Sequence, residues 1–173
     1  ARATAAIMPQ DLAITSDGAA WVVGNFTGSA TFGETTLVSV GSEDIFVALL
    51  SKDGRWLRAF RAGGVSLDRV FGLGLDPGGD LWLVGTFYST CTFGTTSLAA
   101  AGTGPDAFVA RVSPDGTWRW AIRVGGVGVD EGRAIAVDGT NGAFVGGYFQ
   151  DNAAFGTRTV NSAGTEDAFV ARV

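Results

Sequence analysis

The chain contains one short segment three times at nearly equal intervals, and this repetition limits the folds open to it. "DIFVALL" begins at Asp44, and "DAFVARV" begins at Asp106 and again at Asp167, so that the copies are 62 and 61 residues apart. A fixed period over most of a chain is typical of architectures that stack copies of one small unit. We therefore expect three tandem copies of one structural unit.

Three further motifs recur with the same spacing. Their copies are "WVVGNF" at 21–26, "WLVGTF" at 82–87 and "FVGGYF" at 144–149; "TFG" at 31–33 and 92–94 and "AFG" at 154–156; and "DGRWLRAFRAGG" at 53–64 with "DGTWRWAIRVGG" at 115–126. Four landmarks that share a period of 61 to 62 residues do not arise by chance.

Within each period the local pattern is that of β-strands. In "DAFVARV" the residues Phe108, Ala110 and Val112 fall on one face and Val109 and Arg111 on the other, as a period of two requires. Clusters of Gly, Pro, Asp and Ser separate such segments, and no window has a helical period. Each repeat is predicted to hold four main strands, with the glycine-rich stretch between the second and third forming an extra hairpin or a long loop.

The segment at 118–124 alternates in the same way. Regular alternation would place its apolar side chains on one face and its arginines on the other, namely Trp118, Trp120, Ile122 and Val124 opposite Arg119 and Arg123.

Tandem copies of four antiparallel strands predict an all-β fold built from β-propeller blades. The predicted blades cover about 7–68, 69–130 and 131–173 within a single domain of residues 1–173. A β-trefoil, which also has threefold repetition with four strands per repeat, is the alternative, although its repeats are usually shorter.

The third copy stops after its third strand, and residues 2–6 align with the end of a fourth strand. We expect the N-terminal segment 1–6 to supply a short version of that strand. Because three blades are too few for a ring of roughly 4 to 8, either further blades of a longer chain or a second copy of this chain would complete it. Unpaired strand edges are expected at both ends.

The motifs also resemble a known family. "AVDGTNGAFVGGYF", "GTEDAFVARV" and "DGTWRWAIRVGG", with the "FG" pairs, look like the SBBP-type β-propeller repeat of bacterial surface and secreted proteins. The resemblance covers nearly the whole chain, except that the first copy has "AITSDG" where the second has "GLGLDPGG". It implies a propeller and an extracellular or cell-surface location, and it implies no common ligand or reaction.

Composition argues against several functional classes. The net charge is −5 and the 12 basic residues are dispersed, which disfavours binding to nucleic acid or to an anionic membrane surface. The chain has no histidine, which removes Ser-His-Asp and Cys-His catalysis and the usual zinc sites. We expect the single cysteine, Cys91, to be a small buried residue, and we predict no catalytic residue, no metal, no cofactor and no membrane insertion.

The acidic residues fall into two groups. Those that recur once per repeat suit turns and strand starts better than a reaction, which needs each group only once; they are Asp44, Asp106 and Asp167, Asp53 and Asp115, and Asp68 and Asp130. The acids outside the repeat register are the candidates for a glycoside hydrolase or lyase, which would need two carboxyls about 5 to 10 Å apart. They are Asp11, Glu34, Asp80, Glu131 and Asp151.

Three aromatic residues depart from the repeat pattern: Trp120, Tyr88 and Tyr148. Aromatic groups with a polar tip stack on sugars and anchor protein partners, so these are the candidate ligand contacts. The sequence favours a non-enzymatic extracellular scaffold or binding module that contacts protein, carbohydrate or copies of itself. The alternatives are a purely structural subunit of a surface fibre and the carboxylate enzyme described above.

Overall fold

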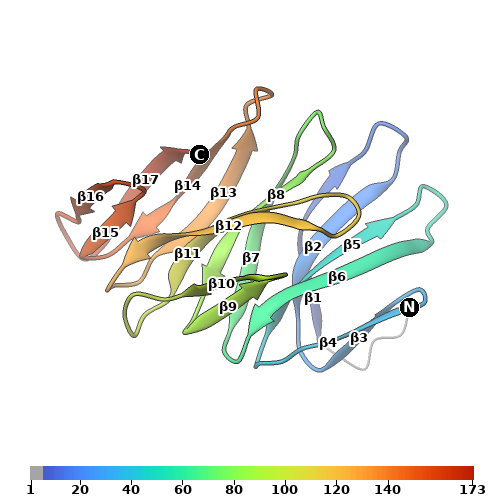
Figure 1. Ribbon diagram of the computed structural model, residues 1–173, viewed down its shortest axis with the longest axis horizontal. Coiled ribbons are helices and arrows are strands. Elements are labelled where there is room, and N and C mark those ends of the chain that lie inside the picture. Colours follow the sequence, from blue (N-terminus) through green and yellow to red (C-terminus); the bar gives the residue numbers. More distant parts are fainter. Residues whose placement is uncertain (1–5) are drawn as a thin grey trace.

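The computed structural model describes residues 6–173, and this part of the chain forms 17 β-strands and no helix (Figure 1). The predicted all-β class is therefore confirmed. None of the described residues belongs to a helix of the length and hydropathy needed to cross a membrane. The expected short strand at residues 1–6 lies almost wholly outside the described residues.

Three main antiparallel sheets, one per sequence repeat, lie side by side along the molecule (Figure 1). A hairpin of the following repeat extends each of the first two to six strands, and the first hairpin forms a separate two-stranded sheet. The strands follow each other in sheet order, apart from the inserted hairpins. The first sheet consists of β1 (Ile7–Ile14), β2 (Ala20–Phe26), β5 (Asp44–Leu50) and β6 (Trp56–Gly64); the second of β7 (Asp68–Leu75), β8 (Leu81–Phe87), β11 (Asp106–Val112) and β12 (Trp118–Gly126); and the third of β13 (Glu131–Val137), β14 (Ala143–Phe149) and β17 (Asp167–Arg172). No closed barrel or ring forms within residues 6–173.

The glycine-rich stretch of each repeat forms a hairpin, the first of the two predicted alternatives. The hairpins are β3 (Ser29–Phe32) with β4 (Thr35–Val38), β9 (Thr90–Phe93) with β10 (Thr96–Ala99), and β15 (Asn152–Phe155) with β16 (Arg158–Asn161). The second hairpin does not pair with its own sheet: β9 pairs with the end of β6, and in the same way β15 pairs with the end of β12. Each of these two hairpins thus ties its sheet to the preceding one.

The expectation that Trp118 and Trp120 share a face is wrong. A β-bulge at Arg119 interrupts the alternation, because Trp120 lies opposite Arg111 and Trp118 opposite the next residue, Val112. Trp118 consequently packs on the first-sheet side of the second sheet, whereas Trp120 packs on the side that faces the third sheet. Ile122, expected beside them in the core, is largely exposed.

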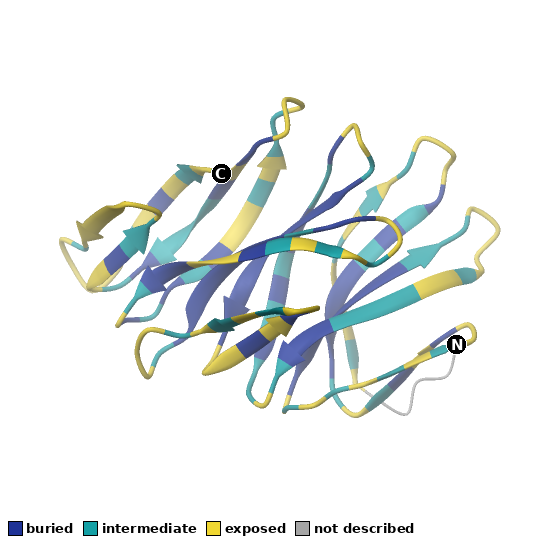
Figure 2. Cartoon of the chain, viewed as in Figure 1, coloured by how far each residue is buried: buried dark blue, intermediate teal, exposed yellow. Residues whose placement is uncertain are grey.

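Most of the core lies between the sheets, and a smaller cluster around Phe32 and Phe46 packs the β3–β4 hairpin on the first sheet. One cluster, which includes Trp21 and Phe108, fills the space between the first and second sheets, and another, which includes Trp82 and Phe169, fills the space between the second and third. Figure 2 shows the buried residues along the middle strands and the exposed ones at the turns and toward β15 and β16. The second sheet is therefore covered on both faces.

Three valines at the same repeat position show how completely each sheet is covered. Val47 is 0% exposed in the first sheet and Val109 is 1% exposed in the second, but Val170 in the third sheet is 78% exposed. The difference arises because nothing among the described residues covers the outer face of the third sheet.

We predict that Val109→Ala lowers the free energy of unfolding by about 2 kcal/mol, because it removes two methyl groups from a closed core. Val170→Ala, the same change at the equivalent exposed position, should cost less than about 0.5 kcal/mol. Urea unfolding of both variants measures this difference. Equal losses would show that the outer face of the third sheet is as well covered as the inner interfaces.

Candidate functional site

The three predicted ligand-contact residues do not form one site. Trp120 packs edge-on against Trp82, with ring centroids 5.2 Å apart, at the start of β8. Tyr88 follows the end of β8, so that one strand length separates it from Trp120. Tyr148 lies in β14, half-buried, and its ring lies under the guanidinium of Arg133. Whether any of them contacts a ligand remains a prediction.

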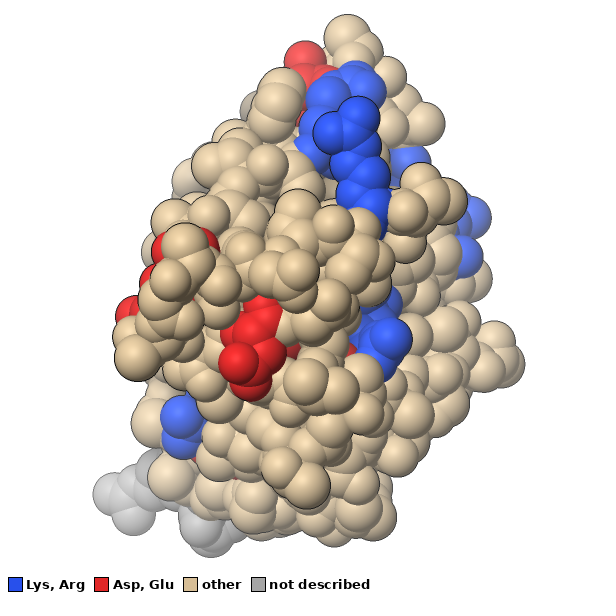
Figure 3. Space-filling view, turned by 90° about the vertical axis from the view of Figure 1, so that its left-hand side faces the viewer, with Lys and Arg blue, Asp and Glu red and all other residues tan. Residues whose placement is uncertain are grey.

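An exposed apolar surface lies on the outer face of the third sheet. Phe144, which occupies the repeat position of Trp21 and Trp82, is 48% exposed, whereas the two tryptophans are 1% and 2% exposed. Val170 lies on the same face. Figure 3 shows the molecule from this side, with uncharged atoms over most of the surface, a group of acidic atoms near its middle and basic atoms along one edge. We call this surface the outer face.

A groove adjoins the outer face at the open edge of β17. Its volume is about 1040 Å³, and it is bounded by the whole of β17, by Ile122 and Val124 of β12 and by the β15–β16 hairpin. Among the described strands β17 pairs only with β14, so its other edge is unpaired. The sequence signal for this groove is the missing fourth strand, but its lining could not be deduced before the hairpin was placed.

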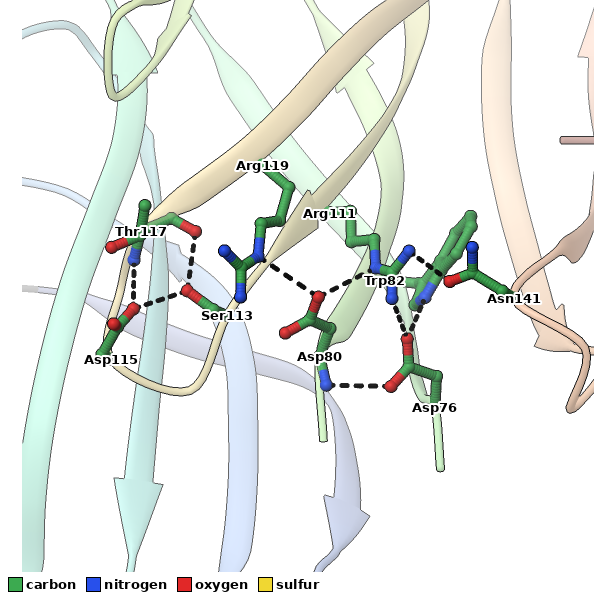
Figure 4. A network of polar contacts seen from close by, with 9 residues as sticks. All are labelled: Asp76, Asp80, Trp82, Arg111, Ser113, Asp115, Thr117, Arg119 and Asn141. Atoms are coloured by element: carbon green, nitrogen blue, oxygen red, sulfur yellow. Dashed lines mark hydrogen bonds and ion pairs between the residues drawn. The ribbon is translucent and has the colours of Figure 1, made fainter. Parts of the chain in front are cut away.

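A polar network connects the turns at the other end of the second sheet (Figure 4). Arg111 is its centre: the guanidinium forms ion pairs with Asp76 at 2.6 Å and with Asp80 at 3.1 Å and donates to Asn141 Oδ1. The same guanidinium lies 5.0 Å from the centroid of the Trp82 ring, whose Nε1 donates to Asp76 at 3.1 Å. The network links the β7–β8 turn to the β13–β14 turn of the next repeat.

This network brings one acid from outside the repeat register, Asp80, beside a second carboxylate, Asp76. Burial alone would raise the pKa of Asp76, but the hydrogen bonds from Trp82 and the Asp80 amide and the charge of Arg111 outweigh it, so that its pKa lies below the ordinary value. A general acid for glycoside cleavage needs a raised pKa. The pair therefore suits a structural link between turns better than that reaction.

The other acids outside the register lie apart from this pair. Asp11 accepts the amide of Leu73 at 2.8 Å, Glu131 pairs with Arg133, and the amide of Asp151 donates to Ser162, while Glu34 is exposed on a hairpin turn. Within the described residues no group of three or more Cys, Asp or Glu side chains could hold a metal ion.

The repeated acids hold strand ends together. Asp44 and Asp106 accept loop amides and pair with Arg61 and Arg123 on the fourth strands of their sheets. Asp68 and Asp130 instead accept the amides of Gly64 and Gly126, the last residues of the preceding fourth strands. The second pair therefore joins each sheet to the next one.

Burial changes the acidity of these carboxyls. It raises the pKa of Asp68 to about 7 and that of Asp106 to about 6, and it raises the pKa of Asp130 as well. One oxygen of each of these three carboxyls has no hydrogen-bond partner among the described residues. Cys91 lies beside Asp68; it is fully buried, as expected, and burial raises the pKa of its thiol, so the reactive thiolate is disfavoured.

No protein-family model matches the sequence, and no curated protein is significantly similar to it. The likeness to the SBBP-type repeat therefore stays a prediction, and function is inferred from the surfaces of the molecule.

We predict that Arg111→Ala lowers the free energy of unfolding by about 3 kcal/mol, because it leaves the buried carboxylate of Asp76 without a cation and Asp80 with only its longer contact to Arg119. Arg119→Ala is the matched control: Arg119 also contacts Asp80, but at 3.4 Å and from an exposed position, so its loss should cost less than about 1 kcal/mol. Denaturant unfolding compares the two variants. A smaller loss for Arg111→Ala than for Arg119→Ala would contradict this account of the network.

The raised pKa of Asp68 predicts that stability falls with rising pH. Between its ordinary pKa of 3.8 and its folded value of about 7, the folded chain keeps a proton that the unfolded chain has lost. The free energy of unfolding should therefore decrease from about pH 4 to about pH 7, to which the raised pKa of Asp106 also contributes.

Asp68→Asn should flatten this slope in denaturant unfolding at a series of pH values. Asp115→Asn is the control, since hydrogen bonds from Ser113 and Thr117 lower the pKa of Asp115 to about 2. Above about pH 5, Asp115 is then ionised in both states, so that its replacement leaves the slope from there to pH 7 unchanged. An unaltered slope in Asp68→Asn would show that Asp68 keeps its ordinary pKa.

Proposed function

We propose that this chain is a non-enzymatic extracellular scaffold built of β-propeller blades, which acts by stacking its terminal sheets against further sheets of the same kind. The observation that carries the proposal is the exposure of the outer face, where Phe144 and Val170 stand uncovered at positions that are buried in the other two sheets. An exposed apolar face of this kind is typical of an interaction surface.

The opposite end of the molecule offers a matching surface. Leu12 and Ile14 of β1 are exposed, whereas their equivalents in β7, Leu73 and Leu75, pack against the first sheet. The first sheet of one chain could therefore cover the outer face of another just as the second sheet covers the first. Such a head-to-tail contact closes into a ring if the rotation fits and otherwise continues as a filament.

Two further points support the proposal. Propeller rings hold roughly 4 to 8 blades, so two chains of three sheets would give a ring within that range. The motif likeness to the SBBP-type repeat supports a location outside the cell, where the partner would be a copy of the chain, further repeats or another surface molecule. The structural contacts of Asp11, Asp80 and Glu131 favour a role without catalysis.

We predict that the chain self-associates and that Val170→Asp abolishes this association, because it buries a charge in the contact. Light scattering across a concentration series should give a multiple of the chain mass for the wild type and a single-chain mass for Val170→Asp. Val65→Asp is the matched control, since Val65 is 71% exposed but lies on the β6–β7 loop, outside the strands of both terminal sheets. A wild type that stays at the single-chain mass at every concentration would refute the stacking proposal.

A further inference from the structure

The edge of β17 is the place where the other two sheets carry a fourth strand. In the first sheet β5 lies between β2 and β6, and in the second β11 lies between β8 and β12. Among the described strands β17 pairs with β14 alone. An unpaired edge presents a row of amide and carbonyl groups that can accept an additional strand.

Beside that edge the third repeat has open space where the first two repeats hold a tryptophan. A Cβ atom on the hairpin residue Gly33 would lie 2.9 Å from the carbonyl oxygen of Trp56, and one on Gly94 would lie 3.0 Å from the ring of Trp118. The third hairpin glycine, Gly156, has the same left-handed backbone conformation but no atom within 4 Å of that position.

The aromatic clusters show the same difference. Phe32 meets Trp56 with ring centroids 5.1 Å apart, and Phe93 meets Trp118 at 5.0 Å, both nearly edge-on. Phe155, the third member of the series, contacts only other phenylalanines and is more exposed than Phe32 and Phe93. A tryptophan from an incoming strand would complete this cluster.

A second feature of the groove is a carboxylate, that of Asp167, which has no cationic partner among the described residues. Arg61 on β6 pairs with Asp44 at 2.6 Å, and Arg123 on β12 pairs with Asp106 at 3.0 Å. Asp167 begins β17 at the equivalent position and lines the groove, but it has no ion pair with any described residue. The groove therefore offers a carboxylate to a cation five residues beyond the tryptophan.

We propose that the groove beside β17 is an acceptor site for one kind of partner, an extended peptide strand that carries tryptophan at its first position and arginine at its sixth. This strand would lie antiparallel to β17, with its tryptophan against Phe155 and Gly156 and its arginine on Asp167. The inference rests on the proposed function, because it names the peptide segment that the groove, as one contact surface of the scaffold, would bind.

The register of the incoming strand follows from the first and second sheets, which both contain a fourth strand. Trp56 lies opposite Leu50 and Trp118 opposite Val112, which are the last residues of their third strands. The incoming tryptophan should accordingly lie opposite Val173. The arginines Arg61 and Arg123 lie opposite Phe46 and Phe108, so the incoming arginine should lie opposite Phe169.

A synthetic peptide with the sequence of residues 115–126, "DGTWRWAIRVGG", tests the proposal on the intact chain. The chain is diluted until light scattering gives a single-chain mass, so that a second copy does not occupy the groove, and binding of the labelled peptide is followed by fluorescence anisotropy. We expect saturable binding with one peptide per chain. Hydrogen exchange should then be slowed in 167–173, and protection of another sheet edge instead would overturn the assignment.

A double-mutant cycle tests the ion pair. Asp167→Asn, which keeps an oxygen for the loop amide of Ala163, should weaken binding about tenfold, and so should a glutamine in the peptide at the position of Arg123. The two changes together should cost little more than either alone. Glu166→Gln, the neighbouring exposed carboxylate, should leave the affinity unchanged. Additive losses would overturn the pairing of this arginine with Asp167.

The outcomes separate this inference from the proposed function. If no saturable binding occurs up to about 1 mM peptide, the acceptor site is refuted, while self-association that depends on Val170 would still support sheet stacking. If the peptide binds and the wild type never self-associates, the acceptor site stands and the stacking proposal fails. A peptide in which alanine replaces the first tryptophan should bind at least tenfold more weakly; equal affinity would refute the pocket at Gly156.

Discussion

The sheets of this chain carry apolar residues on both faces, and each face therefore has to be covered by another sheet. In β8 every residue is buried, with Trp82 directed to the third sheet and Leu83 to the first. A strand of this kind cannot lie on a solvent-exposed surface without exposing large apolar groups to water. Stacking in one direction covers both faces of the second sheet. At the ends of the stack, the third sheet leaves Phe144 and Val170 exposed, and the first sheet leaves Leu12 and Ile14 exposed although the β3–β4 hairpin packs with Phe26 and Phe46.

Polar groups at a fixed position of the second strand fasten each sheet to the next. Asn25 accepts the amide of Val70 at 2.9 Å, and the hydroxyl of Thr86 lies 3.2 Å from the carbonyl oxygen of Asp130. The third repeat has Tyr148 at this position. With no later sheet among the described residues, its hydroxyl contacts Arg133 of the same sheet.

The repeat glycines serve the same joints. Gly63 and Gly125, the second-to-last residues of the fourth strands, both have positive φ. They lie so close to the carboxyls of Asp44 and Asp130 that a Cβ atom would lie about 2.5 Å from them. At pH values above their ordinary pKa, these buried carboxyl groups lower the stability of the fold. They nevertheless accept hydrogen bonds from the backbone amides at the ends of the sheets. This explains why Gly-Gly and Asp recur together at each contact between one sheet and the next.

Much of the fold could be predicted from the sequence, because a repeat multiplies weak local signals. Period-two segments and glycine-marked turns predicted the main strands, and left open whether the extra segment of each repeat is a hairpin or a long loop. Two features could not be predicted. The bulge between Trp118 and Trp120 depends on how β12 pairs with β11, and the pairing of β9 with β6 depends on contacts between different repeats.

Only one feature of the candidate site could be predicted from the sequence, namely that the third repeat lacks a fourth strand. A missing fourth strand is visible when the repeats are aligned, but the sequence does not show that Phe155, Gly156 and Asp167 would border the same groove. Side chains separated along the chain come together there because the hairpin folds back over the edge of its neighbour. The pairing of Asp80 with Asp76 through Arg111 was hidden for the same reason.

The open edge and the outer face belong to the same sheet, which couples strand addition to stacking. A fourth strand on β17 would widen the third sheet and bury Phe155, and the wider sheet would offer a following sheet more apolar area. If the added strand ended in Gly-Gly, this pair would be able to form backbone pairs with a hairpin such as β3–β4. In the same way β9 pairs with Gly63 and Gly64, and β15 pairs with Gly125 and Gly126. The hairpin β3–β4 forms a sheet of its own, so the two ends of the chain carry complementary halves of one joint.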